Sequence, residues 1–150
     1  MRPAITFVKA HMKKRTKSAA EELEALFQAL ADRTRIRLLS LMADGEVCVC
    51  FFVEVLDEPQ PKISRHLAYL RTAGLVTARR EGKWANYTIT PPNHPTVRAA
   101  FEAVMTSLKG DAELQRDRAA LARACCSTRV PELLKRAPRP GIAGQTADGR

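Results

Sequence analysis

The chain has 150 residues, a formal net charge of +9 and a hydrophobic share of 45%. This length fits one compact domain with tails and excludes two independent cores, because domains usually take about 100 to 200 residues. The basic balance favours a polyanionic partner such as a nucleic-acid backbone. No stretch is apolar enough for a secretory signal or a membrane span, so we expect a cytoplasmic protein with no membrane partner.

The N-terminal part of the sequence predicts a basic arm followed by two helices. Residues 1–17 contain Lys and Arg without an apolar period, which indicates a flexible arm. A capping-box pattern then opens a helix over about 19–31. Asp32 is expected to cap a second helix, which stops at Asp44-Gly45 because glycine accepts the left-handed conformation that a helix end requires.

The next segment predicts two helices joined by a short turn. Asp57-Glu58-Pro59 separates them, and Pro61 opens the fourth helix because its missing amide hydrogen would be unpaired there anyway. Gly74 ends this fourth helix. The third helix has an apolar stripe at spacing i, i+3, i+4 and i+7, which consists of Val49, Phe52, Val53 and Leu56.

A β-hairpin is expected directly after the fourth helix. Its strands are predicted over Leu75 to Arg80 and Lys83 to Thr90, with a tight turn at Glu81-Gly82. Two helices joined by a short turn and followed by a hairpin form the element order of a winged helix-turn-helix. We therefore predict a mainly helical α+β fold with a two-stranded β-hairpin wing.

The C-terminal part predicts two further helical segments and a tail. One apolar stripe covers 97–108, and a last helix starting near Asp111 places Leu114, Leu121 and Cys125 on one side. Small polar residues, Pro and Gly predict disorder from residue 137 onward. The predicted organisation is a basic arm (1–17), a DNA-binding and dimerisation domain (18–108), a helical extension carrying Cys125 and Cys126 (109–136) and a disordered tail (137–150).

The outward arc of the fourth helix and the turn of the hairpin are the candidate DNA-binding surface. Long basic side chains reach phosphates or guanine edges, and short polar groups contact bases or the backbone. A solvated helix face explains the helix pattern equally simply, but the basic cluster on the following wing weakens that alternative. The candidate residues are Gln60, Lys62, Ser64, Arg65 and Tyr69 on the helix and Arg79, Arg80 and Lys83 on the wing.

The four cysteines occur as Cys48-Val49-Cys50 and Cys125-Cys126. In a reducing cytoplasm they are better interpreted as ligands or reactive thiols than as structural disulfides. Thiolates are soft donors that suit soft, thiophilic ions. Residues two apart on a regular helix do not face each other. The first turn of the third helix must therefore unwind, or the pair must sit just before it, for Cys48 and Cys50 to hold one ion.

Three stretches together resemble the ArsR/SmtB family of metal-responsive repressors: residues 30–39, residues 60–67, and the wing residues 80–84 with Tyr87. The resemblance covers about residues 20–108. It implies a homodimer that is joined through the first helix and the helix at 97–108. This dimer is expected to bind a palindromic operator in double-stranded DNA and to leave it when an inducer binds.

Residues 46–50, Glu-Val-Cys-Val-Cys, resemble the thiol box of arsenic-, cadmium- and lead-responsive members of that family. The resemblance implies arsenite as the inducer, with antimonite or a soft divalent metal as alternatives. The box continues with Phe51-Phe52-Val53, where the family's arsenic box has Asp-Leu and sometimes a third cysteine, so a third ligand must come from elsewhere. We predict that Cys125, Cys126 or both complete the site, from the same or the partner subunit. Three thiolates suit arsenic or antimony, whereas four suit cadmium, zinc or lead.

Other interpretations of the cysteines stay open. Cys125 is alternatively a small apolar residue packed beside Leu121. An exposed thiol of low pKa near Arg and Lys side chains predicts a redox switch instead of a metal sensor. An enzyme with a cysteine nucleophile is disfavoured, because the histidines lack an evident partner. The resemblance also points to a second family site on the dimer helix, but His94 and Glu102 alone do not provide its ligands, so none is expected there.

Overall fold

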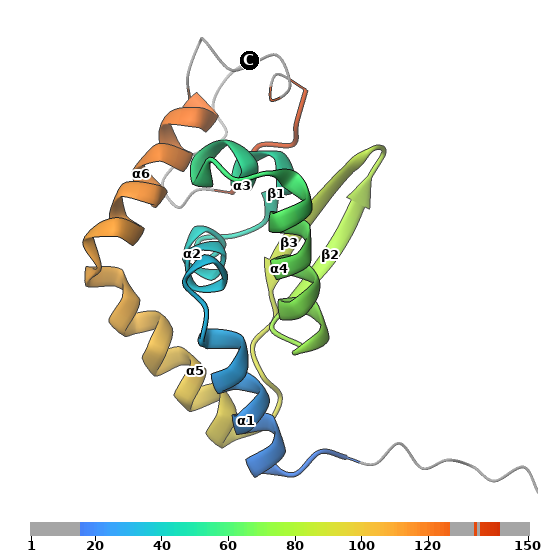
Figure 1. The fold of residues 1–150 in the computed structure, drawn as a ribbon, viewed down its shortest axis with the longest axis vertical. Coiled ribbons are helices and arrows are strands. Elements are labelled where there is room, and N and C mark those ends of the chain that lie inside the picture. The colour runs from blue at the N-terminus through green and yellow to red at the C-terminus, as the bar shows by residue number, and fades with distance from the viewer. Residues whose placement is uncertain (1–15, 127–133, 135, 142–150) are drawn as a thin grey trace, which may run out of the picture.

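The computed structural model describes residues 16–126, 134 and 136–141. In Figure 1, α5 and α6 run along one side of the molecule, the β2–β3 hairpin lies on the opposite side, and α2 and α3 lie between them. The elements are α1 (Ala19–Leu30), α2 (Arg33–Leu41), β1 (Val47–Cys48), α3 (Val49–Leu56), α4 (Gln60–Thr72), β2 (Val76–Glu81), β3 (Trp84–Ile89), α5 (Pro95–Ser107), the short 3-10 helix η1 (Leu108–Gly110) and α6 (Ala112–Cys126).

The helix starts follow the predicted caps. The Ser18 hydroxyl accepts the Glu21 amide at 3.2 Å, and the Glu21 carboxylate accepts the Ser18 amide at 2.8 Å. Asp32 accepts the Arg35 amide at 2.9 Å and so caps α2. The end of α2 differs from the prediction, since the helix stops at Leu41 and a turn leads to Gly45, whose φ is 147°. The chain needs this turn to enter β1 at Val47.

The core fixes α4 against α2 and α3. The inner faces of these three helices carry large apolar side chains that are almost fully buried, and burying each of them contributes about 1.5 to 3 kcal/mol. Because the inner face of α4 is held in this way, the position of its outer face is also set. The buried residues are Leu38 and Leu39 on α2, Phe51 and Phe52 on α3, and Ile63, Leu67 and Leu70 on α4.

The sheet has three strands in the order β1-β3-β2, where the sequence analysis predicted two. The hairpin wing is present, and the short β1 joins its inner edge by pairing Val47 with Tyr87 and Cys48 with Asn86. The predicted turn position was also wrong by one residue. Because a two-residue hairpin turn of type II′ takes glycine at its first central position, the turn uses Gly82 and Lys83. Glu81 instead pairs with Trp84.

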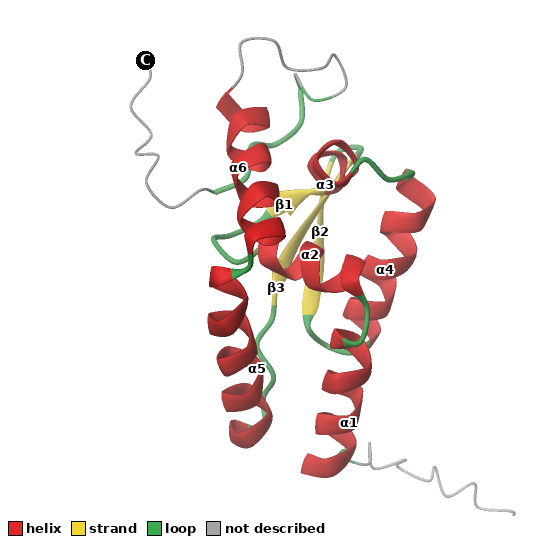
Figure 2. Cartoon of the chain, turned by 60° about the vertical axis from the view of Figure 1, so that its left-hand side comes forward, coloured by secondary structure: helices red, strands yellow, loops and turns green. Residues whose placement is uncertain are grey.

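An ion pair fastens α6 to α2. Arg37 donates from Nε and Nη2 to the two carboxylate oxygens of Asp117, at 2.7 and 2.8 Å. The Asp117 side chain is only 7% exposed and that of Arg37 21%. The predicted apolar side of α6, formed by Leu114, Leu121 and Cys125, is buried. Figure 2 shows α6 alongside α2, with its C-terminal end reaching the region of α3 and β1.

The described residues beyond α6 pack at the end of the molecule where α6 ends. Leu134 and Ala137 belong to the buried core, and Arg139 donates a hydrogen bond to the carbonyl oxygen of Cys125. A Cβ atom placed on Gly45 would lie 2.9 Å from the carbonyl oxygen of Gly141. The predicted start of the tail, residue 137, therefore lies inside residues 136–141, which the structure describes. Most of the predicted arm (1–15) and residues 142–150 lie outside the described residues.

Within the described residues, no helix is both long and apolar enough to cross a membrane.

Candidate functional site: a thiol pair between the wing and the helix-turn-helix

Cys48 and Cys50 bring their sulfur atoms together at the joint between β1 and α3. The Cys50 thiol donates to the Cys48 sulfur, with 3.2 Å between the two Sγ atoms. The sequence left two arrangements open, an unwound first turn or a pair just before the helix, and the structure is nearer the second. Cys48 has an extended backbone (φ −72°, ψ 142°) and occupies the N-cap of α3, while Cys50 lies in the first turn. The pair therefore meets without any unwinding of the helix.

The environment of the pair favours a single thiolate near neutral pH. The hydrogen bond from the Cys50 thiol lowers the pKa of Cys48 to about 7, and the backbone amides of Cys50, Ala85 and Val49 act in the same direction. The Cys50 thiol donates to Cys48 and is partly buried, and both effects raise the pKa of Cys50. Thiolates are the form that binds soft ions, so Cys48 is prepared to be the first ligand.

We expect Cys50→Ala to raise the pKa of Cys48 toward the ordinary cysteine value of about 8.5. The substitution removes the hydrogen bond that stabilises the thiolate. A pH titration of thiolate ultraviolet absorbance measures this change, with Cys125→Ala as the matched control that leaves the low-pH step in place. An unchanged lowest step in the Cys50→Ala variant would contradict the geometry.

Two polar residues next to the pair were not predicted as functional. Asn86 is the cross-strand partner of Cys48 and is 1% exposed. Its Nδ2 donates to Glu81 at 3.4 Å, and within the described residues its Oδ1 has no partner. Glu46 lies two residues before Cys48 and accepts from Arg79. Both placements depend on β1, and a two-residue strand gives no period in the sequence that could have revealed them.

The C-terminal cysteines lie at the end of α6. The Cys125 side chain is buried, and α6 packs on α3. Within the part of the chain that the structure describes, no three Cys, His, Asp or Glu side chains are close enough to hold a metal ion. The side chain of Cys126 lies outside the described residues. The contribution of Cys125 and Cys126 to the site stays a prediction.

The candidate DNA-binding residues lie on the accessible outer face of α4 and on the hairpin. Lys62 is partly exposed and contacts Glu58 at 2.6 Å. The Tyr69 ring is exposed, and the Arg35 guanidinium lies 4.1 Å from its centroid. On the wing, the Lys83 ammonium lies 4.9 Å from the centroid of the Trp84 ring. The remaining candidates, Gln60, Ser64, Arg65, Arg79 and Arg80, are exposed.

Two of the histidines contact residues of the fold. His66 is half-buried with its Nδ1 3.5 Å from Asp32. His94 caps α5 by accepting the Thr96 amide at 3.3 Å. Neither histidine therefore belongs to the surroundings of the thiols.

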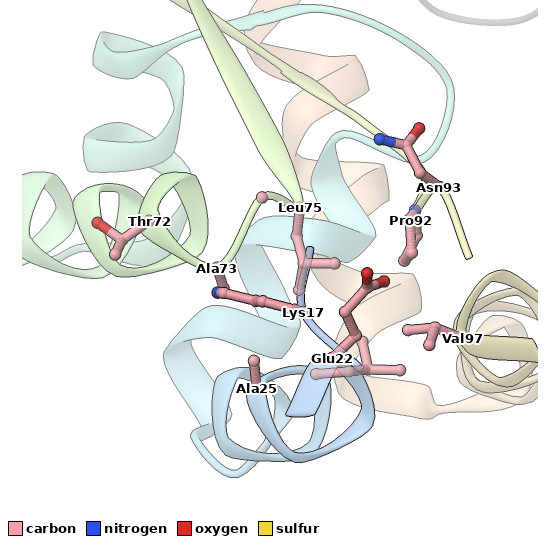
Figure 3. Close-up of a pocket in the computed structure, with 11 residues that line it drawn as sticks. Lys17, Glu22, Ala25, Thr72, Ala73, Leu75, Pro92, Asn93 and Val97 are labelled. Carbon is pink, nitrogen blue, oxygen red and sulfur yellow. The ribbon is translucent and has the colours of Figure 1, made fainter. Parts of the chain in front are cut away.

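A separate cavity of about 250 Å³ lies between the start of α1, the end of α4 and the start of α5 (Figure 3). Its charged lining residues are Lys17 and Glu22, and no cysteine lines it. This volume is below the range of about 300 to 1,000 Å³ that is usual for small-molecule pockets. A second hollow, of about 400 Å³, has Lys17, Arg65 and Tyr69 among its lining residues, and no cysteine lines it either. Neither hollow offers a thiolate to a soft ion, whereas the thiol pair does.

The two helices α3 and α4, joined by a short turn and followed by the β2–β3 hairpin, place the protein in the winged helix-turn-helix class. The family model described as "Bacterial regulatory protein, arsR family" matches residues 32–78. The chain is 46% identical over 70 residues to an uncharacterised HTH-type transcriptional regulator of Methanocaldococcus jannaschii, covering 46% of this chain and 79% of that protein. The chain belongs to the ArsR family.

Two further similarities bear on function. The arsenical resistance operon repressor of Escherichia coli K12 is 51% identical over 67 residues, which cover 44% of this chain and 57% of the repressor. The chain thus spans little more than half of that relative. The homodimeric winged helix-turn-helix DNA-binding domain of a possible ArsR-family regulator from Mycobacterium bovis matches with a TM-score of 0.51 and 28% identity, covering 67% of this chain and 90% of that domain.

Proposed function

We propose that the protein is a repressor that binds a palindromic operator as a homodimer and dissociates when trivalent arsenic binds Cys48 and Cys50. The observation that carries this proposal is the 3.2 Å approach of the two sulfur atoms at the joint of β1 and α3. One soft ion can contact both sulfurs there. The name of the Escherichia coli relative, an arsenical resistance operon repressor, supports the choice of arsenic.

The binding chemistry is a ligand exchange that needs no oxidant. Each thiol replaces one hydroxyl group of arsenous acid, and the thiol proton leaves with that hydroxyl as water. Cys48 and Cys50 supply two sulfurs, and Cys125 or Cys126, from the same or the partner subunit, supplies the third. Antimonite fits the same three donors, whereas cadmium, lead or zinc favours four.

Release of DNA follows from the position of the pair. Cys48 belongs to the sheet that contains the wing, and Cys50 belongs to the helix that supports α4. An ion held by both sulfurs replaces their mutual hydrogen bond and alters how β1 meets α3. Operator and inducer then favour different arrangements of one joint, so each weakens the binding of the other by the same factor.

The test is a gel-shift titration on the promoter region upstream of the protein's own gene. Arsenite, antimonite, cadmium and peroxide are added separately to the wild type and to a Cys125→Ser, Cys126→Ser double variant. We expect arsenite or antimonite to release the wild type at the lowest concentration. Full arsenite sensitivity in the double variant would refute a third ligand from α6, and no release of the wild type by any of these ions would refute metal sensing.

Release by peroxide alone would favour the second candidate function, a thiol redox switch. The same sulfur approach favours it, because two adjacent thiols can form a disulfide while peroxide accepts two electrons and two protons and becomes two waters.

The DNA-binding role of α4 predicts that Arg65→Ala weakens specific operator binding by about 1 to 3 kcal/mol without altering arsenite affinity. Arg65 is exposed on the outer face of α4. Fluorescence anisotropy with labelled operator measures the loss. Arg123→Ala removes the same charge from an exposed position on α6 and serves as the control. Equal losses in the two variants would show a general charge effect instead of groove recognition.

The proposed homodimer predicts that Phe27→Glu shifts the protein toward monomers. Phe27 is 56% exposed on α1, which packs on α5, so its ring is available to a second subunit. Sedimentation velocity over a dilution series measures the shift, and the neighbouring exposed substitution Gln28→Glu is the matched control for the added charge. A Phe27→Glu protein that dimerises as tightly as the wild type would place the interface elsewhere.

A further inference from the structure

Glu46 and Arg79 join the thiol box to the wing. Arg79 donates from Nε to Glu46 at 3.1 Å and from Nη2 at 2.5 Å, so its guanidinium is held by both carboxylate oxygens. Nη2 also lies 3.3 Å from Glu81. The hydrogen bond from Arg79 lowers the pKa of Glu46, which keeps the carboxylate charged. The contact spans 33 residues of sequence and fixes the direction of a wing arginine.

The strand register explains how this contact meets the thiols. Cys48 and Arg79 both pair with Asn86 on the central strand β3, from its two sides, so all three side chains lie on one face of the sheet. Glu46 lies just before β1, two residues ahead of Cys48, and its contact with Arg79 places its side chain on the same face. A shift of the Cys48 backbone therefore moves the Glu46 backbone with it.

The remaining donor of Arg79 is available to DNA. Among the described residues, Nη1 has no partner, and the side chain is 56% exposed. Glu46 thus leaves one edge of the guanidinium free while holding the other. An exposed ion pair of this kind adds little to stability. The pair can still fix the direction in which the Arg79 guanidinium points, and a measurement of stability would not detect that effect.

We propose that Glu46 is the positioning residue through which occupancy of the thiol pair reaches the DNA-binding wing. In the ligand-free protein Glu46 aims Arg79 at the operator backbone. Binding of a soft ion at Cys48 and Cys50 displaces β1, and Glu46 then withdraws from Arg79. This inference rests on the proposed function, since it takes the thiol pair as the inducer site, and it adds the route by which that site acts.

The test is a double-variant cycle on operator affinity, measured with and without arsenite. In the wild type, arsenite is expected to lower operator affinity by a factor within the usual allosteric range of about 5 to 150. Glu46→Gln is expected to have, before arsenite is added, the reduced affinity of the arsenite-loaded wild type. Arsenite should then change it by less than about threefold. Adding Glu46→Gln to Arg79→Ala should have no further effect.

Two variants and one separate measurement make this outcome specific. Arg80→Ala removes the neighbouring wing arginine and is expected to weaken operator binding while keeping the full arsenite response. Glu54→Gln removes an exposed carboxylate on α3 and should change neither quantity. Arsenite affinity of the DNA-free protein, measured by titration calorimetry, is expected to agree within about threefold between Glu46→Gln and the wild type.

Each outcome of the cycle has a distinct meaning. A full arsenite response in Glu46→Gln would overturn the inference while leaving the proposed function in place. A wild type that keeps its operator when its thiols are saturated with arsenite would overturn the proposed function itself. Loss of arsenite binding in Glu46→Gln would make Glu46 part of the ligand site and would equally overturn its role as a link to the wing.

Discussion

Cys48→Ser is expected to abolish arsenite-induced release of the operator while leaving operator affinity within about twofold of the wild type. Loss of a group that merely supports a metal ligand costs about 10- to 100-fold in affinity, so loss of a sulfur ligand should cost at least about 100-fold. Serine suits the fold at this position, because Cys48 occupies the N-cap of α3 and a serine hydroxyl accepts amide hydrogen bonds there.

Arsenite titrations of the operator complex, followed by anisotropy, measure the effect of Cys48→Ser. Cys50→Ser should behave in the same way, since the two sulfurs form one pair. Circular dichroism of both variants verifies the fold. A Cys48→Ser protein that releases DNA at the wild-type arsenite concentration would move the inducer site away from β1 and α3.

Asp117→Ala is expected to lower the free energy of unfolding by about 2 to 4 kcal/mol, because it leaves the partly buried guanidinium of Arg37 with only a longer contact, 3.6 Å from Glu113. For a domain of this size, such a loss corresponds to a fall in Tm of roughly 10 °C. The physical cause is the bidentate contact at 2.7 and 2.8 Å, in which the carboxylate is nearly buried. Thermal and urea unfolding measure both quantities.

A second variant separates the unpaired charge from loss of packing. Replacing both partners, as Arg37→Met with Asp117→Leu, should recover most of the lost stability, because a buried ion pair can be exchanged for apolar side chains of similar size. Glu113→Gln alters the more exposed contact with Arg33 and the longer contact with Arg37, and should cost much less. If Asp117→Ala unfolds like the wild type, α6 is not fastened to α2 by this pair.

The helices and the hairpin could be predicted from the sequence, because caps, apolar spacing and turn residues mark them locally. The caps at Ser18 and Asp32 and the glycine after α4 are local signals, and the structure confirms them. The stripe of α3 was right for Phe52 and Leu56 but missed Phe51, which is also buried. The hairpin was also predicted, with its turn displaced by one residue. The exposed positions of the candidate side chains on α4 could be predicted because they follow from the buried face of that helix. Their contact with DNA stays a prediction.

Features formed by distant residues could not be predicted. β1 has two residues and exists because β3 offers it an edge, so no local period indicates it. The extended conformation of Cys48 follows from that pairing, and it brings the Cys48 sulfur beside Cys50. The ion pair of Arg37 with Asp117 spans 80 residues. Charges of this kind look like ordinary surface residues until the fold brings them together.

The arsenite affinity of the protein in the presence and absence of its operator tests the central claim most directly. If the thiol pair and the DNA-binding surface favour different arrangements of the β1–α3 joint, arsenite binds the operator complex more weakly than the free protein. The factor must equal the one by which arsenite weakens operator binding. Equal arsenite affinities with and without DNA would contradict the account.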